Sequence, residues 1–208
     1  MSAFAVLRLR RAFRPLALLV LAAPLLGACG VNDIPTYDEA AKAAWAQVQN
    51  QYQRRADLVP NLVETVRGFA QQEREVLTAV TEARSRVAQM NLPADVLTNP
   101  DAFRAFQENQ RQLTGALSRL MVVVERYPEL KSNQNFLTLQ AQLEGTENRI
   151  AVARRDYIQS VQRYNTELRT FPGVVWATLL YRDAKVKETF TAEAGAEQAP
   201  RVNFGPRT

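Results

Sequence analysis

The chain has 208 residues, 47% of them hydrophobic, and carries a formal net charge of +5 with no histidine and one cysteine. Its length is that of one ordinary domain. The lack of histidine and of a second cysteine excludes His-based triads, Cys–His dyads, His/Cys zinc sites and intrachain disulfides.

The first 29 residues differ in composition from the rest of the chain. Four arginines without any acidic residue precede an apolar run from Leu16 to Leu26, and the small pair Gly27-Ala28 precedes Cys29. This order is typical of a secretory signal peptide. The apolar run is shorter than the roughly 20 residues that a membrane-spanning helix requires. We therefore expect residues 1–28 to be removed as a lipoprotein signal peptide.

The sequence around the cysteine, Leu26-Gly27-Ala28-Cys29, resembles the lipobox of bacterial lipoproteins. The resemblance implies a diacylglycerol on the thiol, cleavage before Cys29 and a triacylated amino terminus, palmitate being a typical chain. Such a lipid holds a protein stably on a membrane. Gly30 follows, where inner-membrane retention often uses aspartate, which favours the outer membrane and a periplasmic domain. The alternatives are a plain secreted protein and, from Arg10-Arg11, export by the twin-arginine route.

Removal of the signal peptide changes the charge of the protein. The mature chain of 208 − 28 = 180 residues loses four arginines, so its net charge is 5 − 4 = +1. A nearly neutral chain gives no electrostatic argument for binding nucleic acid, and we expect no such partner.

A short tether, residues 29–36, leads into one long helical segment from Tyr37 to Met90. Apolar residues recur there every three or four positions, which indicates a helix packed along one face. Arg55 and Glu73 occupy this stripe in place of apolar residues. Pro60 predicts a kink, because proline removes a backbone donor and clashes with the preceding turn.

Two further long helices and a shorter one follow. Asn99 is expected to cap a helix that starts at Pro100 and ends near Arg126. The remaining segments are a third long helix over residues 129–170, a shorter amphipathic helix over residues 174–190 and a disordered tail over residues 191–208.

No strand pattern competes with these helices, and short connections between long helices imply antiparallel neighbours. The sequence therefore predicts an all-α fold, an elongated antiparallel up-and-down bundle of three long helices plus a shorter fourth helix. The heptad-like spacing leaves open an intermolecular coiled coil, that is, a homo-oligomer.

Three polar clusters interrupt the apolar pattern, namely residues 54–66, 127–136 and 147–157. In this order they are similar to the LemA family, whose pattern reads close to R-R-x-D-L-I-P-N-L-V-E-T-V, Y-P-x-L-K-A-N-x-N-F and E-N-x-I-x-x-A-R-x-x-Y-N, followed by Y-N and F-P. Tyr164-Asn165 and Phe171-Pro172 match the last two pairs. The resemblance covers roughly residues 40–190.

The resemblance implies an elongated helical bundle over residues 37–190 and a membrane-anchored protein. Some members of the family are linked to envelope or intracellular membrane organisation, and no biochemical activity is established for the family. This chain departs from the pattern in three ways: the family usually begins with an uncleaved transmembrane helix, Ile158 stands where it has asparagine, and Ser132 replaces alanine.

Eight polar residues of the first and third clusters form a candidate site: Arg54, Arg55, Asp57, Asn61, Glu64, Glu147, Asn148 and Arg154. Arg55 is expected to pair with Glu144 or Glu147 if the two helix faces meet. The functional interpretation is a ligand pocket beside Pro60. The structural interpretation is a buried polar network that fixes the register between helices.

We expect a non-enzymatic envelope lipoprotein that scaffolds or tethers, with no catalytic residue, metal or cofactor. Its expected partners are the membrane, through the lipid on Cys29, and an envelope protein or a second copy. The alternative is a ligand-binding or hydrolytic lipoprotein that uses the polar cluster near Pro60, with Glu144 and Glu147 as a glycosidase carboxylate pair. Trp176, Leu179 and Leu180 are expected to face inward, the alternative being that they dock on a membrane or a partner.

Overall fold

The computed structural model describes residues 30–191, which are helical with no strand in that range. The predicted signal peptide, Cys29 and residues 192–208 of the predicted disordered tail lie outside the described residues. Six helices occupy the described range: α2 (Asp33–Arg67), α3 (Arg74–Ala88), α4 (Pro100–Val124), α5 (Pro128–Lys131), α6 (Gln134–Glu167) and α7 (Gly173–Leu179).

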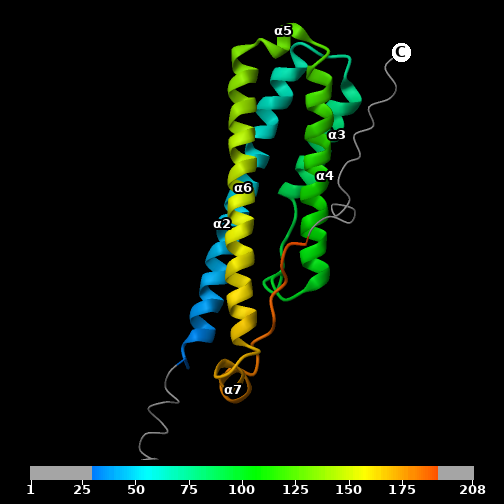
Figure 1. The fold of residues 1–208 in the computed structure, drawn as a ribbon. Helices are drawn as coiled ribbons and strands as arrows, with labels where there is room; N and C mark the ends of the chain where they lie inside the picture. The colour runs from blue at the N-terminus through cyan, green and yellow to red at the C-terminus, as the bar shows by residue number, and fades with distance from the viewer. Residues whose placement is uncertain (1–29, 192–208) are drawn as a thin grey trace, which may run out of the picture.

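Three long helices form an elongated antiparallel bundle (Figure 1). In that view α2 and α4 run upward and α6 runs downward, with α2 and α6 packed along one another. The shorter α3 covers only the upper half, where it packs on α2 and α4, and α5 joins α4 to α6 at the top. The all-helical antiparallel bundle predicted from the sequence is therefore confirmed.

Asparagine side chains start two of the long helices. The Oδ1 atom of Asn99 accepts hydrogen bonds from the backbone N–H groups of Asp101 and Ala102, both at 3.2 Å, and Pro100 occupies the first turn, as predicted. Asn133 starts α6 in the same way. The third helix was expected to begin at residue 129, but residues 128–131 form only one turn before the chain restarts at Asn133.

The single helix expected over residues 37–90 is wrong. Helix α2 continues through Pro60 and ends at Arg67, residues 68–73 form a turn, and α3 folds back. An unbroken helix would extend roughly 80 Å at 1.5 Å per residue. It would carry Leu77, Val80 and Ala83 away from α4, against which the fold now buries them.

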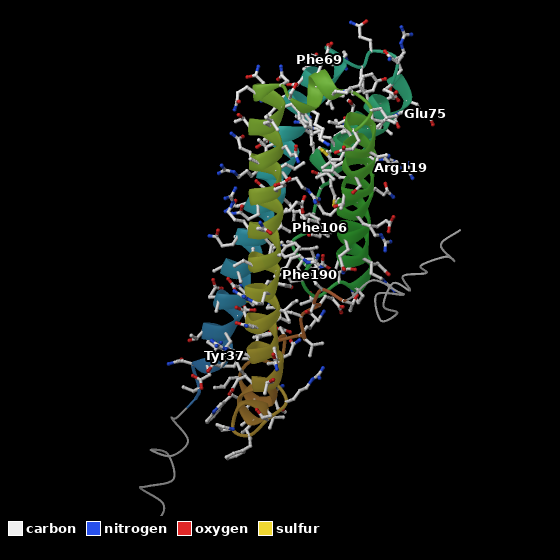
Figure 2. All side chains as sticks on the ribbon, turned by 45° about the horizontal axis from the view of Figure 1, so that its top comes forward. Tyr37, Phe69, Glu75, Phe106, Arg119 and Phe190 are labelled. Atoms are coloured by element: carbon white, nitrogen blue, oxygen red, sulfur yellow. The ribbon has the colours of Figure 1, made fainter. Side chains whose placement is uncertain are left out.

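The tether is also shorter than expected, because α2 begins at Asp33 and Ile34 is buried. The helix expected over residues 174–190 is wrong in its second half. Helix α7 ends at Leu179, and residues 184–190 are extended along the lower half of the bundle (Figure 1). Phe190 and Phe106 lie between α4 and α6 in Figure 2. Within residues 30–191, no helix is both long and apolar enough to cross a bilayer.

The interior contains two apolar clusters, one above the other along the bundle. The upper cluster includes Val59, Leu62, Val66, Leu77, Val80, Leu113, Leu117, Leu120, Leu130, Phe136 and Leu143. The lower cluster is rich in aromatic residues and includes Trp45, Tyr52, Phe103, Phe106, Ile150, Tyr157, Val161 and Phe190. On each long helix, about two turns separate the last residue of one cluster from the first residue of the other. The candidate site lies in this interval between the two clusters.

Candidate functional site: a polar layer and groove

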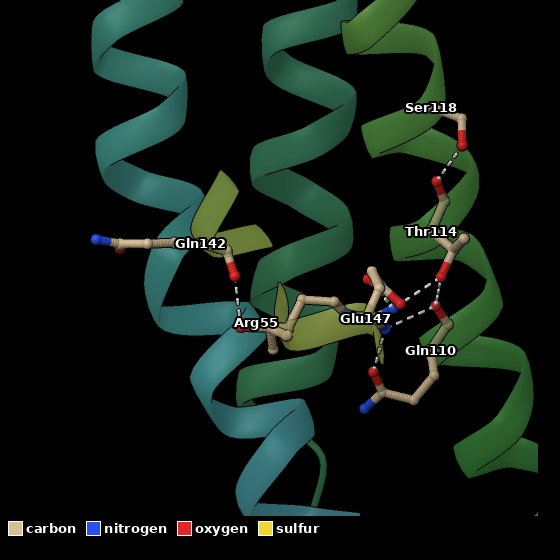
Figure 3. Close-up of polar contacts among 7 residues, drawn as sticks. Arg55, Gln110, Thr114, Ser118, Gln142 and Glu147 are labelled. Carbon is tan, nitrogen blue, oxygen red and sulfur yellow. Dashed lines mark hydrogen bonds and ion pairs between the residues drawn. The ribbon is translucent and has the colours of Figure 1, made fainter. Parts of the chain in front are cut away.

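A buried arginine connects the three long helices between the two apolar clusters. Arg55 of α2 is only 2% exposed, and its Nη1 donates to Thr114 Oγ1 of α4 at 2.9 Å and to Glu147 Oε1 of α6 at 3.0 Å. Its Nη2 donates to the carbonyl oxygen of Gln110 at 3.1 Å and to Gln110 Oε1 at 2.7 Å. Figure 3 shows Arg55 reaching from α2 toward Gln110 and Thr114. The ion pair with Glu147 is one of the two pairings expected from the sequence.

The buried polar side chains lie at the same level on all three helices. On α2, Arg55 falls between Tyr52 and Val59, which belong to the lower and upper clusters. Gln110 lies between Phe106 and Leu113 on α4, and Glu147 lies between Leu143 and Ile150 on α6. A slip of one helix by a turn would place the Arg55 charge against an apolar layer, which is costly. We therefore expect this polar layer to favour one register of the three long helices.

An open groove of about 790 Å³ lies against the polar layer. Its lining includes Tyr52, Arg55, Gln110, Thr114, Glu147 and Arg154, together with Arg104, Glu108 and Arg111 of α4 and Phe190 of the extended segment. Glu147 is 42% exposed there, although its partner Arg55 is buried. Four arginines against two glutamates give the lining a local charge of 4 − 2 = +2.

Two aromatic rings connect the groove to the lower apolar cluster. The Arg55 guanidinium carbon lies 5.0 Å from the centre of the Tyr52 ring, and that of Arg154 lies 4.4 Å from the centre of the Phe190 ring. Burial raises the pKa of the Tyr52 hydroxyl above its ordinary value, so this hydroxyl is neutral at physiological pH. The groove therefore presents fixed positive charge and neutral hydroxyl groups, an arrangement that suits an anionic or polar ligand.

The structure brings together three of the eight predicted residues, Arg55, Glu147 and Arg154. The other five lie elsewhere on the surface. Glu64 pairs with Arg67, and Asp57 accepts a hydrogen bond from Gln53. Exposed positions are occupied by Arg54, Asn61 and Asn148, the first and last of which line separate shallow hollows. The prediction of one cluster near Pro60 is wrong in this respect, because at about 100° of rotation per residue Asp57, Asn61 and Glu64 lie on the side of α2 opposite to Arg55.

Sequence reasoning missed several lining residues, including Tyr52, Gln110, Thr114, Arg104 and Glu108. Gln110 did carry a signal, since it occupies an apolar stripe position on α4, as Arg55 does on α2. The remaining residues look like ordinary polar positions of an exposed helix face. Glu144 accepts a hydrogen bond from Gln140 and does not line the groove, so it does not join Glu147 in one site.

A second set of polar contacts holds the extended segment. Asn165 Nδ2 donates to the carbonyl oxygen of Lys187 at 2.9 Å, and Asn165 Oδ1 accepts from the Lys187 N–H at 2.8 Å. The Tyr157 hydroxyl donates to the Glu188 carbonyl at 2.7 Å. The Nζ atom of Lys187, whose side chain is 6% exposed, lies 2.7 Å from Asp38 Oδ1 at the start of α2. Tyr157 of the third cluster and Asn165 of the Tyr164-Asn165 pair therefore dock this segment.

A third set of contacts joins the two turns at the top of the bundle. The Tyr127 hydroxyl donates to Glu73 Oε1 at 2.9 Å, and Arg126 lies 3.0 Å from the other Glu73 oxygen. This explains why Glu73 interrupts the apolar stripe: it belongs to the turn after α2, where it binds the end of α4. No group of three acidic side chains in residues 30–191 is placed to hold a metal ion.

Fold and site together define an elongated helical bundle whose three long helices are joined by one buried polar layer. A comparison with known families matches residues 44–204 to the LemA family, and the chain belongs to that family. The resemblance stated from the motifs is thus confirmed.

Three relatives show what this chain is similar to. Magnetosome protein MamQ 2 and Magnetosome protein MamQ 1 of Paramagnetospirillum magneticum are each 24% identical over 187 residues, which cover 82% of this chain and 68% of the relative. Magnetosome protein MamQ of Magnetospirillum gryphiswaldense is 26% identical over 157 residues, covering 68% of this chain and 58% of the relative.

Proposed function

We propose that this LemA-family protein is a non-enzymatic scaffold or tether of the bacterial envelope, held on the outer membrane by a lipid on Cys29 with its bundle in the periplasm. The observation that carries the proposal is the arrangement of the polar core. Arg55, the most buried charge, makes four hydrogen bonds to neighbouring helices. These bonds stabilise one helix register, as a rigid spacer requires.

The shape of the bundle supports the same role. The described chain begins at Gly30, at one end of the bundle, and the α2–α3 turn and α5 lie at the other end (Figure 1). A lipid on the residue before Gly30 would therefore attach the bundle by its end and present its opposite end to a partner, either an envelope protein or a second copy. The names of the relatives, which are magnetosome proteins, are in keeping with a structural role.

Metabolic labelling with a fatty-acid probe tests the anchor. The wild-type chain is expected to incorporate the probe and fractionate with membranes, whereas Cys29→Ser loses the label and leaves the membrane fraction. The matched control combines Cys29→Ser with Ser132→Cys, which places a thiol at an exposed position, and it should remain unlabelled. Labelling of either variant, or membrane retention unchanged by Cys29→Ser, argues against lipidation at Cys29.

Crosslinking in cells tests the scaffold itself. Reactive groups at the exposed Phe69 and Arg119 positions, which lie toward the far end (Figure 2), are expected to capture a specific envelope protein or a second copy. Capture of neither would contradict scaffolding.

The groove supports a second candidate function, binding of an anionic ligand. Its lining has a local charge of +2, from four arginines and two glutamates. Thermal-shift measurements with inorganic phosphate and with small dicarboxylates test this candidate. A rise in the unfolding temperature with an anion that is lost in Arg154→Ala supports ligand binding. If no anion changes the unfolding temperature of the wild-type chain, the groove has no anion-binding function.

A further inference from the structure

Apolar side chains gather on the surface at one end of the bundle, around α7. Phe171 is 83% exposed, Leu179 57% and Leu180 60%, and the side chains of Val174 and Val175 are exposed beside them. All five fall within ten consecutive residues. Trp176, Leu179 and Leu180 were expected to face inward; Trp176 is half-buried, whereas both leucines are exposed, contrary to the prediction. Several exposed apolar side chains gathered at one end of a molecule are typical of an interaction site, whereas single exposed leucines are not.

Close packing holds this surface in place. Gly173, the first residue of α7, is buried, and a Cβ atom at that position would lie only 2.2 Å from the carbonyl oxygen of Glu167 at the end of α6. Only glycine permits this approach. The backbone N–H groups of Val174 and Leu180 donate within the segment to Thr170 and Trp176, both at 2.8 Å. The apolar side chains therefore project from a supported turn and helix.

The apolar surface lies where the chain enters the bundle. Gly30 packs beside Pro172, since a Cβ atom at Gly30 would lie 3.4 Å from Pro172 Cγ. Figure 1 shows the start of α2 and α7 at the same end of the molecule. Gly30 directly follows Cys29 in the sequence. A membrane that receives a lipid from Cys29 would therefore meet Phe171 and its apolar neighbours first.

The charge around this surface also favours a membrane. Three basic residues of this region, Arg169, Arg182 and Lys185, and one acidic residue, Asp183, are exposed, whereas the carboxylates of Glu167 and Asp33, close to Gly173 and Gly30, are half-buried. Exposed basic residues next to a surface attract anionic lipid headgroups, and apolar side chains between them enter the boundary of the acyl region.

We propose that the α7 end, residues 171–180, inserts its apolar side chains into the interfacial region of an anionic lipid bilayer and so forms a second membrane contact beside the amino terminus. This contact fixes the direction of the bundle relative to the membrane, which a flexible lipid attachment alone does not. The choice of a membrane as the partner rests on the proposed lipid at Cys29, whereas the contact itself is made by the surface of the folded domain, so its test can succeed or fail independently of lipidation.

Depth-dependent fluorescence quenching tests the contact. The chain has two tryptophans, Trp45 in the lower core and Trp176 in α7. The full chain carrying Trp45→Phe is purified from membranes and reconstituted into vesicles of phosphatidylethanolamine and phosphatidylglycerol that contain nitroxide-labelled lipid. We expect Trp176 to be quenched by nitroxides near the headgroup region. Absence of quenching overturns the inference.

Two matched controls make the result specific. The first moves the reporter to the far end of the bundle, as Phe69→Trp with Trp45→Phe and Trp176→Phe. Phe69 is also partly exposed (Figure 2), and its tryptophan should not be quenched. Equal quenching of both reporters indicates non-specific association and overturns the inference.

The second control compares two sets of serine substitutions. Phe171→Ser, Leu179→Ser and Leu180→Ser together should lower Trp176 quenching to the level of the far-end reporter. Val122→Ser, Leu137→Ser and Val152→Ser remove as many exposed apolar side chains from the sides of the bundle and should leave quenching unchanged. Circular dichroism checks that both variants fold. If Trp176 is not quenched and the protein sediments as a dimer that only the first set dissociates, a second copy covers the surface and the inference is overturned.

The outcomes separate this inference from the proposed function. If Trp176 is quenched in a protein whose Cys29 carries no lipid, the membrane contact of α7 is supported and the proposed lipid anchor is contradicted. If Cys29 carries a lipid and Trp176 is not quenched, the proposed lipid anchor is supported and the membrane contact of α7 is overturned.

Discussion

Arg55 of α2 and Glu147 of α6 form an ion pair at 3.0 Å in which the arginine side chain is 2% exposed and the glutamate side chain 42%. The two partners therefore respond differently to loss of the other. Glu147 can be hydrated from the groove when Arg55 is removed. The Arg55 side chain borders the groove but is almost fully covered, so its charge depends on acceptors from α4 and α6.

We expect Arg55→Ala to lower the free energy of unfolding by about 3 kcal/mol, because it leaves a cavity and removes the donors that bind Gln110 and Thr114. Chemical denaturation measures the change. The adjacent Arg54 is exposed, so Arg54→Ala should stay within about 0.5 kcal/mol of wild type. Equal effects of the two substitutions would contradict a stabilising polar layer.

Asn165→Ala should release the extended segment from α6. Both hydrogen bonds between the Asn165 side chain and the Lys187 backbone are lost, at a cost of about 2 kcal/mol. Hydrogen exchange should show faster exchange at the Lys187 and Glu188 amides, with little change in the upper half. Asn148→Ala, at an exposed position of the same helix, serves as the control. Unchanged exchange in Asn165→Ala would show that the segment is held by other contacts.

Phe190 should contribute most of the apolar docking of the same segment. Its ring centre lies 5.2 Å from that of Phe103 and 5.6 Å from that of Tyr157. Phe190→Ala is therefore expected to lower the free energy of unfolding by about 3 kcal/mol. Phe171→Ala, where the ring is 83% exposed, should change it by less than about 0.5 kcal/mol. A small effect at Phe190 would mean that the segment does not pack on the lower cluster in solution.

The pair of Asp38 and Lys187 makes stability depend on pH. Burial acts to raise the pKa of the Asp38 carboxyl, but the hydrogen bonds and charges of Lys187 and Lys42 outweigh it and hold the pKa below the ordinary value of 3.8. A carboxyl whose pKa is lowered by folding stabilises the folded state above its unfolded pKa. That contribution is lost as the pH falls through 3.8 toward the folded-state pKa.

Wild type should therefore lose more stability than Asp38→Asn between about pH 5 and about pH 2. Thermal melts across this range measure the difference. Asp57→Asn provides a control on the same helix, since Asp57 is exposed and bonded only to Gln53 among the described residues. Parallel pH profiles for wild type and Asp38→Asn would contradict a stabilising Asp38–Lys187 pair.

The helical fold could be predicted because the apolar stripes have the helical period and because Asn99 and Pro100 mark a helix start. Periodicity could not reveal the turn at residues 68–73, since the stripe of α3 continues that of α2 in phase. Residues 180–190 carry helix-like spacing, yet their backbone is bound by Asn165 and Tyr157 from α6. Such tertiary contacts override local propensity, and a single sequence does not display them.

The candidate site was predictable only in part. Arg55 and Gln110 stand at apolar stripe positions, so their burial could be read from the pattern. Arg154 and Glu147 reach the same groove, whereas Asp57, Asn61 and Glu64 share a motif with Arg55 but face solvent. Residues that are adjacent in a helical motif lie on different faces of the helix. A sequence motif therefore does not show which of its side chains meet in one site.

Mass spectrometry of the amino-terminal peptide of the membrane-extracted protein tests the proposed lipid-anchored scaffold most directly. We predict a peptide that begins at Cys29 and carries the mass of a diacylglycerol together with an amide-linked acyl chain. A peptide that begins elsewhere, or an unmodified Cys29, would contradict anchoring by a lipid at this position.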